Sequence, residues 1–236
     1  RNEFVVSDVS ALREVIPAGL SGSCVADATK VIGHLDKQMV GFVRRSPFVQ
    51  LATVDAAGQP FVSPKGDTPG FVKVVDQEGR GVALRIADRP GNRLVFGLQN
   101  ALQGARRVGL CFVIPGNGTT LRCGGRATLS RDPQLLERHA ARGLDAKLVI
   151  QVEVEHAFFH CAKAYLRSQL WQPETWPAEA YHVCFGPYFH SSEARSEALD
   201  TAVNQQCRSF RSAPVEDRSL GDGSASLQAL GTAPHA

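Results

Sequence analysis

Basic and hydrogen-bonding side chains are concentrated between residues 63 and 93 of this sequence. A phosphate dianion in a protein is held by several converging cations and donors. Such groups stand here at Ser63, Lys65, Arg89, Asn92 and Arg93. Glycines at positions 66 and 91 would let the backbone approach a ligand closely. The stretch therefore predicts a site that grips a phosphate group.

The elements that must position these residues are predicted to be mostly β-strands. Apolar residues alternate with polar ones, and Gly, Pro and Asp mark turns between them. The expected strands are 48–54, 59–63, 71–75, 81–86, 107–114, 119–129 and 147–161. The expected helices are 25–45, 94–103 and 132–142, the last with Asp132 as its N-cap. Short strands joined by short turns favour a small antiparallel barrel with peripheral helices, a mainly β (α+β) fold.

Other chemistries find little support in the sequence. No Gly-x-Gly-x-x-Gly turn, Gly-x-Ser-x-Gly elbow, His-Glu-x-x-His pair or phosphate-binding Gly-x-x-x-x-Gly-Lys loop is present. The six cysteines form no Cys-x-x-Cys pair, so no zinc ribbon is indicated. His156 and His160 would share one face of a strand but have no third ligand, so we expect no metal. No residue stands out as a catalytic acid or base.

Charge and hydropathy limit the partners and the location. The chain has 26 basic and 23 acidic residues and a formal charge of +3, too mild for nucleic acid as a main partner. No apolar run approaches the ~20 residues of a membrane span. Residues 1–4 lack the pattern of a secretory signal, and we expect a cytoplasmic protein.

Five short motifs, in order, carry a family resemblance. They are 46–53 (SPFVQLAT), 63–67 (SPKGD), 69–71 (PGF), 88–92 (DRPGN) and 121–126 (LRCGGR). The chain resembles the split β-barrel flavoproteins related to pyridoxamine 5′-phosphate oxidase. Segment 161–171 (CAKAYLRSQLW) resembles the closing segment of a subgroup described as probable FMN-dependent enzymes. No Arg-x-His motif or Trp-Arg-Leu ending of the vitamin-processing oxidases is found, which argues against oxidation of pyridoxamine phosphate itself.

The resemblance implies a homodimer that holds FMN by its phosphate in a cleft between the subunits. The cofactor-binding residues that it implies are Ser63, Lys65, Asp67, Arg85, Arg89, Asn92, Arg93 and Arg122. Arg85 faces either the cofactor or the wet side of its sheet. Arg122 either reaches across the dimer to the neighbour's flavin or pairs with charges on adjacent strands. For Trp171, flavin stacking and a structural role both remain open.

The expected domains are an N-terminal extension (1–24), the FMN-binding barrel (25–177) and a C-terminal extension (178–236), disordered from about residue 213. The expected activity is hydride transfer to or from a small, conjugated molecule, with reduced nicotinamide, NAD(P)H, one candidate electron donor. One alternative keeps the fold but replaces FMN with a deazaflavin. Another is a non-catalytic flavin or haem binding protein, in which a haem would need His156 and His160.

Overall fold

A computed structural model describes residues 5–6, 8–16, 30–76, 81–89, 94–140, 146–179, 181, 183–189 and 193–212. The chain divides into two compact units, 1–176 and 177–236, which are described separately. The predicted disordered segment after residue 212 lies outside the described residues. None of the described helices combines the length and the hydropathy needed to span a bilayer.

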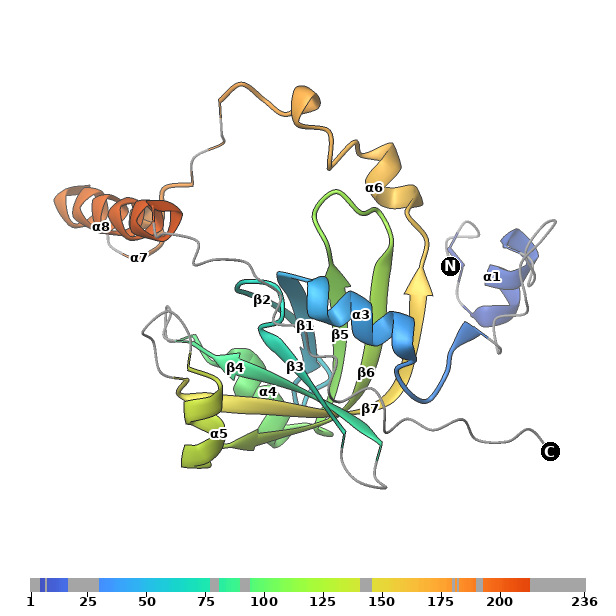
Figure 1. The fold of residues 1–236 in the computed structure, drawn as a ribbon. Helices are drawn as coiled ribbons and strands as arrows, with labels where there is room; N and C mark the ends of the chain where they lie inside the picture. The colour runs from blue at the N-terminus through green and yellow to red at the C-terminus, as the bar shows by residue number, and fades with distance from the viewer. Residues whose placement is uncertain are drawn as a thin grey trace, which may run out of the picture. The chain divides into compact units, whose positions relative to one another are not determined.

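The first unit is built on one seven-stranded sheet, in which every pairing of neighbours is antiparallel (Figure 1). The strands are β1 (Phe48–Val54), β2 (Pro60–Gly66), β3 (Val72–Asp76), β4 (Val82–Asp88), β5 (Arg107–Val113), β6 (Thr120–Ser130) and β7 (Leu148–His160). Their order is β2-β1-β5-β6-β7-β4-β3. The seven predicted strands are all present, with β2 and β4 running slightly further than expected.

The sheet is rolled, because residues from strands far apart in this order lie in contact. Lys65 lies on β2, which forms one edge of the sheet, and its side chain contacts Asp88 on β4, the strand next to the opposite edge strand β3. The two prolines of β2, Pro60 and Pro64, fit such an edge, where a strand lacks a neighbour on one side. Rolling brings the two edges of the sheet together and creates the space between them.

The interior of this unit is mainly apolar. Phe112, Leu51, Leu84, Ile86, Leu121 and Ile150 are among the largest side chains that are fully buried. Helix α3 (Lys37–Arg45) closes one side, where it crosses the strands in Figure 1 and buries Met39, Phe42 and Val43. The ring of Phe42 meets that of Phe159 edge-on, with centroids 5.6 Å apart.

The helix predicted for residues 25–45 is shorter in the structure. The side chain of Asp36 caps the N–H of Met39, so α3 begins at Lys37. Before it, Ile32 pairs with Ala157 as an isolated bridge, which its backbone could not do within a continuous helix. Residues 25–29 lie outside the described part of the chain.

A β-bulge between Gly124 and Gly125 bends β6 against β7. A Cβ placed on Gly125 would lie 1.7 Å from the carbonyl oxygen of Glu153, so no larger residue fits without a shift of the backbone. Gly125 is thus required by the close approach of β6 to β7, and a Cβ on Gly124 would lie 2.7 Å from the carbonyl oxygen of Val108 on β5.

The remaining helices are peripheral. They are α1 (Val9–Val15), α4 (Phe96–Gln103), α5 (Pro133–Arg138), α6 (Lys163–Arg167) and the 3-10 turn η1 (Pro173–Thr175). Asp132 caps α5 as predicted, through a bond from the N–H of Gln134. Figure 1 shows α6 directly beyond the end of β7.

The second unit contains α7 (Gly186–Phe189) and α8 (Glu193–Ser212). The carboxylate of Asp200 on α8 accepts the N–H groups of Phe185 and Gly186, at 2.6 and 3.0 Å. Local patterns do not predict α8, since its segment is rich in Ser, Ala, Glu and Arg and lacks a strong apolar stripe.

Candidate functional site

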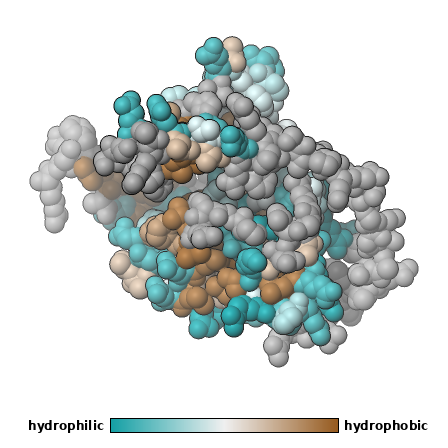
Figure 2. Space-filling view, turned by 90° about the vertical axis from the view of Figure 1, so that its left-hand side faces the viewer, coloured by the Kyte–Doolittle hydropathy of each residue, from teal (hydrophilic) through white to brown (hydrophobic). Residues whose placement is uncertain are grey.

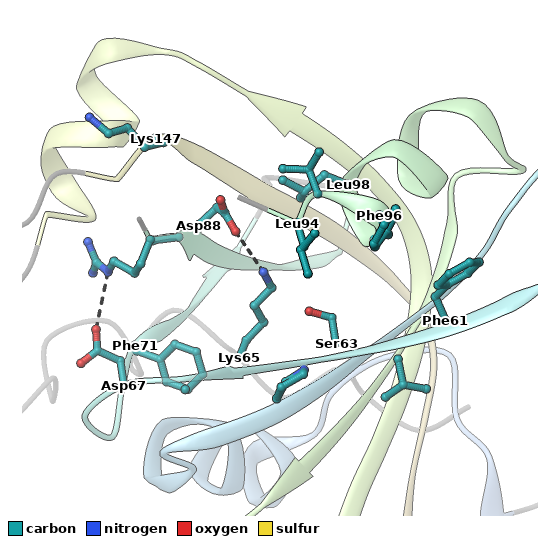
Figure 3. Close-up of a pocket in the computed structure, with 17 residues that line it drawn as sticks. Phe61, Ser63, Lys65, Asp67, Phe71, Asp88, Leu94, Phe96, Leu98 and Lys147 are labelled. Carbon is teal, nitrogen blue, oxygen red and sulfur yellow. Dashed lines mark hydrogen bonds and ion pairs between the residues drawn. The ribbon is translucent and has the colours of Figure 1, made fainter. Parts of the chain in front are cut away.

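A pocket of about 690 Å³ opens between β2, the end of β4 and the start of α4 (Figure 3). This volume lies in the range of typical small-molecule sites. All of residues 61–66 of β2 line the pocket, and strand alternation makes Ser63 and Lys65 half-buried while their neighbours Val62 and Pro64 are exposed. In Figure 3 both side chains point from β2 toward the space beneath α4.

Two cations of the pocket are paired with carboxylates of the pocket. Lys65 Nζ donates to Asp88 Oδ1 at 2.9 Å, and Arg89 Nε lies 3.5 Å from Asp67 Oδ2. The four side chains are between 11% and 22% exposed, so water reaches each of them. Both cations remain accessible to an anionic ligand, which would compete with the carboxylates for them.

The first turn of α4 lines the same pocket. Phe96, Gly97 and Leu98 line it, and Val95, the N-cap residue, supplies no side-chain cap. The first N–H groups of a helix lack partners within the helix and carry a partial positive charge. The lining therefore places the N-terminal turn of α4 beside the cations Lys65, Arg89 and Lys147.

The position of α4 depends on a buried polar contact. Asn100 Nδ2 donates to Thr53 Oγ1 of β1 at 3.2 Å, and both residues are buried. Leu98 and Ala101 are buried on the same helix. These contacts hold the first turn of α4 over β2.

The outer wall of the pocket is apolar and exposed. The rings of Phe61 and Phe96 stack with centroids 6.1 Å apart. Leu94 and Val95 beside them are 60% and 42% exposed. Figure 2 shows apolar side chains, in brown, at the surface of the face that it views, and Val9 and Leu166 are more exposed than Leu94, so exposure by itself does not distinguish this wall.

Of the eight residues predicted to bind the cofactor, the structure brings Ser63, Lys65, Asp67 and Arg89 together in this pocket. Asn92 and Arg93 lie outside the described residues. Arg85 does not line the pocket, and its Nε donates instead to Gln151 Oε1 of β7 at 2.8 Å.

Arg122 also lies away from this pocket, on β6. Its guanidinium is 3.4 Å from Nδ1 of His160. Burial, then Arg122 and Lys30, lower the pKa of His160. Nearby, Trp171 stacks on Tyr165 and donates to the carbonyl of Asn117, which gives this tryptophan a structural role within its own chain.

Most of the lining was not predicted from the sequence, including Asp88, Phe61, Phe96 and Lys147. Asp88 lies in a motif noted above but was not assigned, and Phe61 and Phe96 were read only as parts of a strand and a helix. Lys147 also lines the pocket, because its N–H donates to the carbonyl of Asp88 where β7 starts beside β4. Only the β4–β7 pairing reveals that position, since the two residues are far apart in sequence.

The described residues contain no group of three or more His, Cys, Asp or Glu side chains that could hold a metal ion. Cys123 is buried, and burial raises the pKa of its thiol to about 12. It is therefore an inert core residue.

The sequence profile of pyridoxamine 5′-phosphate oxidase matches residues 35–161, more than half of the chain. The chain belongs to this family. The match spans all seven strands and all eight predicted cofactor-binding positions. The rolled sheet is the split β-barrel of the family.

Solved structures with a similar fold include HupZ of Group A Streptococcus, at 19% identity over 53% of this chain and 93% of that chain, with a TM-score of 0.42. A Clostridium acetobutylicum protein related to general stress protein 26 is 14% identical over 53% of this chain and 90% of that one (TM-score 0.36). An F420 reductase is 20% identical over 53% and 98% (TM-score 0.36). These low scores carry no information about the ligand. No curated protein sequence matches the chain.

Proposed function

We propose that this chain is an FMN-dependent oxidoreductase that acts on a small, conjugated molecule. The observation that carries the proposal is the convergence of Ser63, Lys65, Arg89 and the start of α4 on one pocket of the family's barrel. These groups fit a phosphate ester, because cations and uncapped N–H groups are its preferred partners. FMN supplies hydride transfer when it is bound.

The chain's own residues would then bind and orient the cofactor. Lys65 and Arg89 would exchange their present partners, Asp88 and Asp67, for phosphate oxygens. The hydroxyl of Ser63, on β2, would donate a hydrogen bond to the phosphate. The apolar residues Phe61, Leu94 and Phe96 would cover the less polar part of the ligand and exclude water from it.

A homodimer is part of the proposal. The exposed rings of Phe61 and Phe96, together with Leu94 and Val95, form an apolar surface next to the pocket, of the kind that a second subunit covers.

Asn92, Arg93, Arg85 and Arg122 stay proposed cofactor residues, with Arg122 acting on the flavin of the neighbouring subunit. A cytoplasmic location fits the cysteines described as free, at positions 111, 123, 161 and 184. Reduced nicotinamide is the proposed electron donor.

A visible spectrum tests the proposal. Purified protein is incubated with FMN, passed through gel filtration and scanned, and its subunit mass is compared with its mass in solution. We expect a retained flavin spectrum near one FMN per subunit and a dimer. A protein that stays colourless with FMN refutes the assignment; it is then offered a deazaflavin and haem, which separate the two alternative readings.

A further inference from the structure

A second, smaller cavity lies behind the pocket, and the two share a wall. Its volume is about 100 Å³, and it is lined by the turn after β2, by β3 and by the end of α5. Asp67, Phe71 and Arg89 line both cavities. This space is too small for a flavin ring but has room for a few waters or one tetrahedral oxyanion.

Positive charge dominates the lining of the small cavity. Lys73 of β3, Arg89 after β4 and Arg138 of α5 contribute cations, while Asp67 contributes a carboxylate. Lys73 also lies directly opposite Arg85 in the β3–β4 register. Like charges that face each other across strands are destabilising. Within the described residues, neither Lys73 nor Arg138 has a carboxylate within ion-pair distance.

A buried histidine completes the lining. His139 is 6% exposed, and its Nδ1 lies 2.7 Å from the carbonyl oxygen of Leu135. A carbonyl can only accept, so Nδ1 carries the proton and Nε2 is left as an acceptor. Nε2 is buried and has no partner among the described residues. A buried polar atom without a partner is uncommon in a native protein and calls for an explanation.

We propose that this small cavity is a binding site for a tetrahedral oxyanion, a phosphate ester or sulfate, held by Lys73, Arg89, Arg138 and a protonated His139. The anion matches the cations, and a proton on Nε2 gives that atom a donor role toward the anion. The ligand is either a free anion or a second anionic group on a molecule that fills the larger pocket.

Anion binding at this site takes up a proton. Burial lowers the pKa of His139, and Lys73, Arg85 and Arg89 lower it further, against the opposing effect of the Leu135 bond. The carboxylate of Asp67 faces the same cavity and acts in the opposite sense to these cations. A bound dianion offsets the cations and raises the pKa, so affinity for the anion increases as pH falls.

The test uses inorganic sulfate, whose charge stays constant over the range in which histidine titrates, about pH 5 to 8. The pKa of His139 is measured by NMR of its ring protons in sulfate and in chloride at equal ionic strength, with His139→Gln to assign the signal. We expect sulfate to raise the pKa by at least about half a unit. The shift should disappear in Lys73→Gln/Arg138→Gln, two exposed positions, and persist in Arg131→Gln, an exposed arginine outside the cavity lining.

Equal pKa values in sulfate and chloride would overturn the proposal, and so would a sulfate shift that survives in the double variant. A measurement with FMN and no sulfate separates a free anion from an anionic group of the cofactor. If FMN raises the pKa of His139 as much as sulfate does, and sulfate added afterwards raises it no further, the cavity holds the cofactor phosphate and a separate site is refuted. The sulfate experiment needs no flavin, so a protein that fails to bind FMN still reports on this site.

Discussion

Replacing Lys65 by methionine is expected to weaken FMN binding about 10- to 150-fold. A hydrogen bond to a charged group contributes about 1.5–3 kcal/mol, and ~1.4 kcal/mol corresponds to a factor of ten in the dissociation constant. Methionine keeps the length and apolar stem of lysine, so the change removes the charge with little loss of packing. The ion pair with Asp88 is only about one-fifth exposed, but the open pocket lets water reach the carboxylate that is left behind, so the variant should remain folded.

The partner of Lys65 provides the opposite perturbation. Asp88 holds the ammonium at 2.9 Å and would place a negative charge near the phosphate. Asp88→Asn removes both effects, and we expect FMN to bind about 5-fold more tightly, on the order of 1 kcal/mol after allowing for solvent screening. The double variant should bind more tightly than Lys65→Met alone.

Fluorescence titration gives the FMN dissociation constants of the parent, the two single variants and the double variant, because flavin emission changes on binding. Lys37→Met, an exposed position on α3, is the matched control and should leave affinity within about twofold. Binding of FMN by Lys65→Met within about threefold of the parent would place the phosphate elsewhere. Tighter binding by Lys65→Met than by the parent would refute the reasoning about charge.

Two further predictions concern the fold. Gly125→Ala should lower the free energy of unfolding, measured in urea, by at least ~2 kcal/mol, because the new Cβ would overlap the carbonyl of Glu153. In the control Gly109→Ala, the new Cβ meets Ala52 at 3.6 Å, and the loss should be under ~1 kcal/mol. Equal losses in the two variants would contradict the bulge geometry. The lowered pKa of His139 means that the unfolded chain binds more protons than the folded one below the ordinary value of 6.5, so in sulfate- and phosphate-free buffer stability should fall as pH drops through 6.5. His139→Gln should make this decline shallower, with His160 accounting for part of the remainder, and an unchanged pH dependence would count against the burial of a neutral His139.

Strand positions followed directly from local patterns. Alternating apolar residues and Gly, Pro and Asp turns predicted all seven strands, because period-two alternation and turn chemistry are properties of neighbouring residues. The N-cap at Asp132 followed for the same reason. The start of the helix predicted for residues 25–45 did not, since the bridge from Ile32 to Ala157 joins residues far apart in sequence.

Residue types and local patterns were enough to identify Ser63, Lys65 and Arg89 as suited to hold a phosphate on a barrel of strands. Which side chains meet could be learned from the folded chain alone. The rolling of the sheet set Lys65 against Asp88, strand pairing brought Lys147 to the same pocket, and Arg85 turned instead to Gln151. Distances between strands depend on the packing of the whole core, which no local pattern of residues encodes.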